Sequence, residues 1–292
     1  MKRKFLLFTV LLLIILLVFI KLFAGNFALL GIKELNKTSN INVLPQKVKF
    51  SFPVSLNFNK VSIFNKRKPF LNVELDTLKT YLSLKGLLTL VIDVKSKGTL
   101  YDGNAKFDIW KNFRSEDIRA DLFLENVNIS KHSFLKNFPI SGGFLNLRAF
   151  NFLFDKKFNI VYLGGDFNLS RLSFDSAFKI PALLSGLPLD VEVPEISISN
   201  ISSVYKLKEK DLYLNNFKFE SDLINAESKN CEYNFKSNNF SKCIIKFNFT
   251  DKGLKNFSSL LSLLAGGRIK DTSQYAIELE KKNVKFLSSL TF

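Results

Sequence analysis

The chain has 292 residues, and its 42 Lys and Arg exceed its 26 Asp and Glu, so the formal net charge is +16. With 47% hydrophobic residues but only 13 Gly and 7 Pro, the composition excludes collagen-like and low-complexity chains and suits one large domain or two small ones. One His, two Cys, one Trp and one Met leave few of the side chains that most catalytic and metal sites use.

The first 24 residues have the pattern of a membrane anchor. Residues 5–20 are apolar except for Thr9, and residues 22–24 extend the run to roughly 20 residues, the length that crosses a bilayer as a helix. The basic start would also suit a cleaved signal peptide, but such a peptide has an apolar core of only about 7–15 residues. We therefore expect residues 1–24 to form a cytoplasmic tip and a retained transmembrane anchor in a bacterial inner membrane, with the bulk of the chain in the periplasm.

The remainder is predicted to contain a juxtamembrane linker over residues 25–46 and a single exported β domain over residues 47–292. Beyond residue 30, 38 Lys and Arg remain against 26 Asp and Glu, a net charge of +12. This charge would suit anionic lipid headgroups or an acidic partner, but the Lys residues are scattered as on an ordinary solvated surface. Nucleic acid is not expected as a partner, because the domain would lie outside the cytosol.

From about Lys47 onward, apolar and polar residues alternate in short segments separated by Gly, Asn, Asp and Pro. This period of two is typical of antiparallel strands with one buried and one solvated face. We expect an all-β domain of a dozen or more strands, forming a large curved antiparallel sheet with the shape of a meander, trough or open barrel. The clearest strands are predicted at residues 71–75, 105–109, 145–149, 212–219 and 275–279.

Two exported segments have a helical pattern instead. The apolar positions of the first are Leu254, Phe257, Leu260, Leu261 and Leu264. They share one face of a short amphipathic helix that Gly266 and Gly267 would end. Such a helix could lie on a membrane surface or bind a partner, but packing on the sheet is the commoner arrangement. A second helix is predicted at residues 176–187, interrupted by Pro181.

The candidate site residues are few. Cys231 and Cys243 flank a polar turn between two alternating segments, and in an oxidising compartment such a pair more often forms a disulfide than a redox centre. His132 has no His, Cys or Glu at metal-ligand spacing and is predicted to be a loop residue. No Gly-x-Ser-x-Gly elbow and no phosphate-binding Gly loop occurs. The sequence thus predicts one disulfide and no catalytic, cofactor-binding or metal site.

Gly residues recur where strands are expected to begin, at Leu100-Tyr-Asp-Gly103, Ile140-Ser-Gly-Gly-Phe-Leu-Asn-Leu147 and Gly164–Leu169, and predict turns or bulges there. Together with the anchor, the late helix and the terminal strand at 275–279, these segments resemble the type II secretion system protein N family over most of residues 70–290. The chain departs from that family at Glu280, where the usual Gly of the last strand is absent, so the C-terminal end is expected to pair differently.

The layout is also similar to the wider AsmA-like proteins, which implies a second hypothesis. The secretion family implies a non-enzymatic inner-membrane accessory that contacts other type II secretion components in the periplasm. The AsmA-like resemblance implies a curved trough whose apolar face carries lipid acyl chains between the inner and outer membranes. The chain is too short to cross a periplasm alone, which favours the accessory role. An outer-membrane barrel would also have alternating strands, but the apolar anchor argues against it.

Overall fold

The computed structural model describes the chain in segments, most of which belong to strands. The described residues are 26, 29–30, 32–34, 36–37, 41–51, 55–65, 72–83, 86, 89, 91–112, 118–154, 160–175, 178–180, 191–193, 195–237, 239–264, 271–281 and 283–287.

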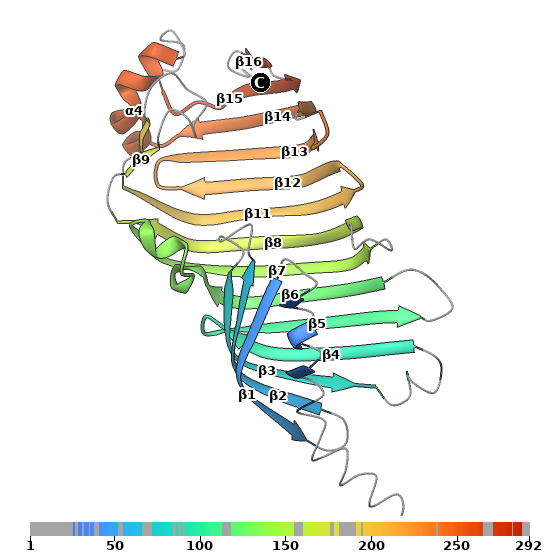
Figure 1. Ribbon diagram of the computed structural model, residues 1–292. Helices are drawn as coiled ribbons and strands as arrows, with labels where there is room; N and C mark the ends of the chain where they lie inside the picture. The colour runs from blue at the N-terminus through green and yellow to red at the C-terminus, as the bar shows by residue number, and fades with distance from the viewer. Residues whose placement is uncertain are drawn as a thin grey trace, which may run out of the picture.

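One antiparallel sheet of 14 strands dominates the fold, which confirms the predicted all-β antiparallel class (Figure 1). Its order follows the chain from β1 to β8 and then from β11 to β16, so every strand pairs with its neighbour in sequence within the sheet. The small sheet β9–β10 is inserted between β8 and β11, and α4 between β14 and β15. The strands of the large sheet are β1 (Ile41–Ser51), β2 (Ser55–Asn65), β3 (Val73–Leu82), β4 (Val91–Leu100), β5 (Gly103–Asn112), β6 (Ile118–Asn128), β7 (Ile140–Phe154), β8 (Ile160–Phe174), β11 (Ile196–Lys208), β12 (Asp211–Ser221), β13 (Ile224–Asn234), β14 (Asn239–Phe249), β15 (Tyr275–Lys281) and β16 (Asn283–Leu287).

Tight turns make this meander possible. Tyr101 and Asp102 both have positive φ, 48° and 65°, and join β4 to β5 as a two-residue hairpin loop. Two left-handed residues in succession match the right-handed twist of the flanking strands. The turn or bulge predicted at Leu100–Gly103 is therefore confirmed as a turn.

Bulges hold the apolar residues on one face of the sheet. Asn126, Asn151 and Asn216 have positive φ values of 53°, 55° and 52°, and each lies where the strand register shifts. One extra residue at a bulge turns an i, i+2 step into an i, i+3 step, so Leu124 and Val127 point to the same side. Asn is one of the few residues other than Gly that adopt this conformation readily.

At two of the bulges, a side chain on the face away from the apolar residues accepts a hydrogen bond from the backbone amide of the bulge residue. The amide of Asn126 donates a hydrogen bond to Oδ1 of Asn146 at 2.9 Å. The amide of Asn151 donates to Oδ1 of Asp121 at 2.8 Å. Each bond replaces a ladder bond that the extra residue interrupts, so the bulges are built features of the sheet rather than defects.

The helix predicted late in the chain is confirmed as α4 (Asp251–Leu264). Leu254 and Phe257 pack against the cluster of Phe247, Phe249 and Tyr275 on the sheet. The helix predicted at 176–187 was wrong where the structure describes it, because Phe178–Ile180 is strand β9 and pairs with β10 (Val191–Val193). The following Pro181 disfavours a helical conformation at Ile180 and directs it to the extended region.

The folded region starts earlier than residue 47. β1 begins at Ile41, and the described residues between 26 and 37 are helical. Ile32 packs against the core cluster of the N-terminal strands, and the side chain of Asn36 exchanges two hydrogen bonds with the backbone of Val43. Part of the segment expected to be a linker therefore belongs to the folded domain. The anchor predicted at 5–24 lies outside the described residues; within those, no helix has both the length and the apolar composition that spanning a bilayer requires.

Candidate functional site

The two faces of the large sheet differ in chemistry. Through the strand register, Phe107 lies opposite Leu122, Leu147 opposite Phe167, and Leu214 opposite Cys231, all on one side. The intervening positions carry the charged and amide side chains, such as Lys106, Asp108, Arg148 and Asp166. Because successive side chains of a strand point to opposite faces, one face of the central strands is mainly apolar and the other carries most of the charged and amide side chains. We call them the apolar face and the polar face.

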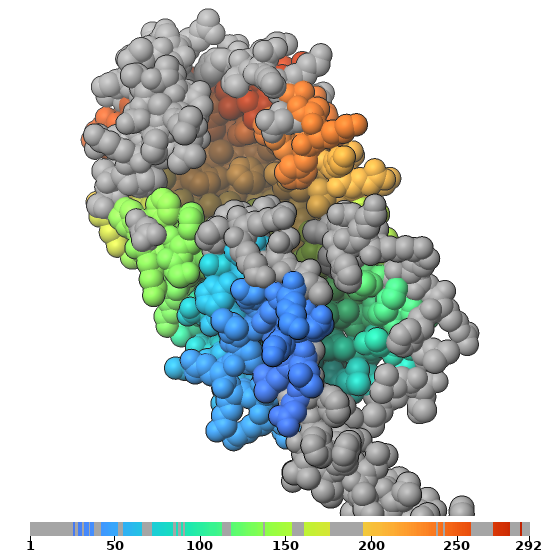
Figure 2. Space-filling model, in the orientation of Figure 1, coloured from blue at the N-terminus to red at the C-terminus, as the bar shows by residue number. Residues whose placement is uncertain are grey.

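The middle of the apolar face is open. Phe107 is 39% exposed, whereas the core residue Val61 near the N-terminal edge is 2% exposed. Leu122, Leu147 and Phe167 are only half-buried, although each lies in the centre of a long strand. In the view of Figure 2, the molecule is hollowed over the gold-coloured strands of the C-terminal half. We call this open apolar face, which includes Phe107, Leu122, Leu147 and Phe167, the groove.

A flattened tyrosine forms part of the floor of the groove. The hydroxyl of Tyr205 donates a hydrogen bond to the backbone carbonyl of Arg148 at 3.3 Å, two strands away. This reach is possible because Gly165 lies between them: a Cβ there would be 2.7 Å from the Tyr205 hydroxyl oxygen and 1.9 Å from the Arg148 carbonyl oxygen. Burial, and secondarily the charge of Asp166, raises the pKa of Tyr205 to about 12. The phenol is therefore neutral, and the floor carries no charge there.

Two clusters of buried side chains border the groove. At the N-terminal end, Phe58, Val61, Leu75, Leu100 and Val127 form a buried cluster. A second cluster, made by Leu172, Ile196, Ile198 and Leu223, lies on β8, β11 and the β12–β13 turn, and Phe257 of α4 packs against it. Apolar burial of this kind stabilises the strands beside the groove.

A defined cavity opens on the apolar side, beneath the connection from β6 to β7. That connection contains two 3-10 turns, η2 (Ile129–Lys131) and η3 (Leu135–Asn137). The cavity has a volume of about 470 Å³. The sheet contributes Val73, Leu100, Leu124, Val127 and Leu145, and the turns contribute mainly apolar side chains with His132 and Tyr101 at the side. Apolar cavities of this size are typical of sites for small apolar ligands.

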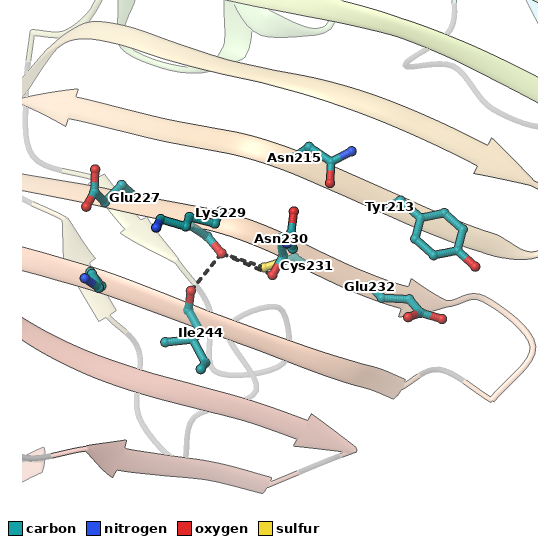
Figure 3. Close-up of a pocket in the computed structure, with 10 residues that line it drawn as sticks. Tyr213, Asn215, Glu227, Lys229, Asn230, Cys231, Glu232 and Ile244 are labelled. Atoms are coloured by element: carbon teal, nitrogen blue, oxygen red, sulfur yellow. Dashed lines mark hydrogen bonds between the residues drawn. The ribbon is translucent and has the colours of Figure 1, made fainter.

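The polar face carries a second cavity of about 670 Å³ over β12, β13 and β14 (Figure 3). Tyr213 and Asn215 of β12 lie beside Asn230 and Glu232 of β13, their partners in the register. The register of β13 and β14 shifts between Glu227 and Cys231, which shows a bulge beneath this cavity. Its lining combines charged and amide side chains with Tyr213, Cys231 and Ile244.

Cys231 and Cys243 lie directly opposite each other on β13 and β14 and form a disulfide, with their Cα atoms 4.3 Å apart. Ser228 supports the pair: its hydroxyl donates to the carbonyl of Ile244 at 2.7 Å and lies 3.3 Å from Sγ of Cys231. The bond joins two strands of the sheet and lies at the C-terminal part of the molecule, away from the 470 Å³ cavity.

His132 lies in the connection from β6 to β7, between the two 3-10 turns. Its ring contacts Tyr101 edge-on with the centroids 5.7 Å apart, and its Nδ1 accepts a hydrogen bond from the amide of Phe134 at 3.2 Å. The residue thus lines the apolar cavity and positions the turn. Within the described residues, no group of three or more His, Cys, Asp and Glu is arranged to hold a metal ion.

Sequence reasoning did not find the groove residues or the loop beside the cavity. Tyr205 and the turns at 129–137 had no distinguishing motif, because their roles depend on contacts across several strands. Gly165 belonged to the Gly-containing segment Gly164–Leu169, but its place beneath Tyr205 depends on a contact between strands. One signal was present: an apolar i, i+3 step centred on Asn, as in Leu124 to Val127, marks a bulge inside an alternating segment.

The chain was compared with protein-family models, with curated proteins and with solved structures, and none of these three comparisons found a match.

Proposed function

We propose that the chain binds lipid acyl chains along the groove, as a non-enzymatic, membrane-anchored protein that holds or moves lipid outside the cytosol. The single observation that carries this proposal is the open apolar face in the middle of the sheet. A scaffold that acts only by surface contact has no need of such a face, because partly exposed aliphatic and aromatic side chains are unfavourable in water.

The chemistry of the groove suits an acyl chain. Its central side chains are mainly aliphatic or aromatic, and the hydroxyls of Tyr205 and Ser203 on this face donate hydrogen bonds to backbone carbonyls. An acyl chain needs no hydrogen bonds and gains free energy from apolar contact along its whole length, at about 0.8 kcal/mol per buried CH₂ group. A headgroup would remain in water beyond the rim, so the groove would not have to desolvate a charge.

Site-specific photocrosslinking in living cells tests this proposal. A benzoylphenylalanine at position 107 points into the groove, whereas the same residue at position 108 points to the polar face of the same strand and is the matched control. We expect lipid adducts on the purified protein from position 107 and few or none from position 108. Equal labelling of both positions, or no lipid adduct at position 107, would contradict the proposal.

A second candidate function is that of an accessory component of a type II secretion system. The observation that favours it is the cavity of about 670 Å³ on the polar face, because a hollow lined by an aromatic ring, that of Tyr213, can receive a side chain of another protein. A crosslinker placed at position 213 tests it. Adducts with secretion components at position 213, without lipid at position 107, would replace the lipid proposal by the accessory one.

A further inference from the structure

The connection from β6 to β7, residues 129–139, exposes two large aromatic side chains. Phe134 is 43% exposed and Phe138 is 39% exposed, and their ring centroids lie 5.8 Å apart. We call residues 129–139 the Phe loop. Two adjacent phenyl rings that are exposed on so short a loop form a small apolar patch, and the contact of this patch with water is unfavourable.

The Phe loop is ordered by its own backbone, so the exposure of its rings is a built feature. The amide of Leu135 donates to the carbonyl of His132 at 3.0 Å, and the amide of Phe138 donates to the carbonyl of Leu135 at 3.0 Å. At its start, Oδ1 of Asn128 accepts from the amide of Ser130 at 3.2 Å. The loop therefore presents Phe134 and Phe138 without having to be ordered on binding, which favours association.

The charge of the Phe loop is positive. It contains Lys131 and Lys136 and no acidic residue. Lys131 forms an ion pair with Asp102 of the neighbouring turn. Both Lys131 and Lys136 are exposed. Aromatic rings next to lysines on an exposed loop are the combination found at the interface of a membrane with water, where the rings enter the headgroup region and the lysines meet anionic lipid.

The same loop lies at the apolar cavity of about 470 Å³. Phe134 and Leu135 line this cavity together with Leu124 and Leu145 of the groove floor. A lipid that leaves a bilayer at the Phe loop would therefore pass from one apolar environment to another without crossing water.

From this arrangement we infer that the Phe loop docks on an anionic phospholipid bilayer and is the port through which acyl chains reach the groove. The inference rests on the proposed lipid-binding function and adds to it the place and the chemistry of the membrane contact. Phe134 and Phe138 enter the headgroup region, Lys136 meets anionic headgroups, and the cavity receives the first part of the acyl chain.

Vesicle flotation tests the inference with the full-length protein held in amphipol, which shields apolar segments of the chain itself. The target vesicles contain phosphatidylcholine alone or with about one third phosphatidylglycerol, which supplies the anionic charge. The variant is the double substitution Phe134→Ser and Phe138→Ser. The matched control is Phe150→Ser with Phe235→Ser, two rings that are 40% and 56% exposed and lie outside the loop.

We expect the protein to float with the anionic vesicles, the loop variant to bind them at least about ten-fold more weakly, and the control to bind as the parent does. Lys136→Glu should weaken binding to the anionic vesicles and leave binding to phosphatidylcholine alone unchanged. Unaltered binding of the loop variant, or an equal loss in the control, would overturn the inference, as would a parent protein that binds neither vesicle.

A second measurement separates the port from the groove. Binding of fluorescent lysophosphatidylcholine, used as a monomer without vesicles, reports the groove directly. Phe138→Ser alone is the variant for this measurement, because Phe134 lines the cavity and Phe138 lies outside its lining. We expect Phe138→Ser to retain monomer binding while it binds the anionic vesicles more weakly than the parent protein does. Retained monomer binding with unaltered vesicle binding would reject the port and leave the proposed function standing. Failure of the parent protein to bind the monomer would reject the proposed function, and the port with it.

Discussion

Replacing Gly253 by Ala should loosen α4, although Ala is the better helix former. Gly253 lies in the first turn of α4, where Thr250 precedes the helix and accepts a hydrogen bond from the amide of Gly253 through its Oγ1 at 3.1 Å. In an isolated helix the substitution would stabilise by up to about 1 kcal/mol. In this protein a Cβ at position 253 would lie only 1.9 Å from the backbone carbonyl oxygen of Leu223, about 1.5 Å short of the 3.4 Å at which ordinary contact begins.

The structure sets the size of the effect. The same carbonyl of Leu223 accepts hydrogen bonds from the amide of Thr250 at 3.0 Å and from its hydroxyl at 3.2 Å, so moving it away weakens both. Overpacking of a backbone contact costs about 1–3 kcal/mol, and the net contribution of one such hydrogen bond is about 1 kcal/mol. After the gain in helix propensity is subtracted, the docking of α4 should weaken by about 2 kcal/mol.

Hydrogen exchange of the full-length protein measures this locally. A loss of about 2 kcal/mol corresponds to roughly 30-fold faster exchange of the amides of α4, if local opening controls the exchange. Asn256→Ala is the matched control, since Asn256 is exposed on the same helix and should gain a few tenths of a kcal/mol. Slower exchange of α4 in the Gly253 variant, as in the control, would show that the clash with the sheet does not govern the docking of the helix.

Three further predictions concern stability. Cys231→Ser with Cys243→Ser should lower the free energy of unfolding by about 3 kcal/mol in urea titrations, because the disulfide closes a separation of 12 residues, and an unchanged midpoint would contradict this. Asn126→Val should cost about 1–2 kcal/mol while Asn126→Gly should not, because φ is 53° there, and equal midpoints for the two would remove the argument from the bulge. Hydrogen bonds from Ser273, and then from Tyr275, lower the pKa of Asp271, so this carboxylate contributes stability above its ordinary pKa that is lost as the pH falls below about 4. Thermal scans of Asp271→Asn should show a weaker loss of stability in that acidic range than the parent protein shows, and parallel curves would refute the linkage.

The alternation of apolar and polar residues determined the class of the fold. Segments such as 105–109 and 275–279 were recognisable as strands because period two is a local property of the chain, and the absence of helices between them required antiparallel pairing. The helix α4 was recognisable for the same reason, through its 3.6-residue spacing and the two Gly residues after it. The facing cysteines follow from local order too, because a hairpin pairs residues at a short separation.

Only the tertiary structure decided which side chains share the groove. A period of two shows that a strand has two faces. Each bulge adds one residue, however, so the residues after it lie on the face opposite to the one that a strict period of two would give them. A bulge in turn depends on the backbone conformation of a single residue, as at Asn126. Tyr205 forms part of the floor because it reaches over Gly165 to Arg148, a contact between residues 57 positions apart. The Phe loop and the 470 Å³ cavity likewise depend on strands brought together by the whole meander. Local sequence specifies periodicity, whereas a surface built from many strands depends on their register, and register is decided where the strands meet.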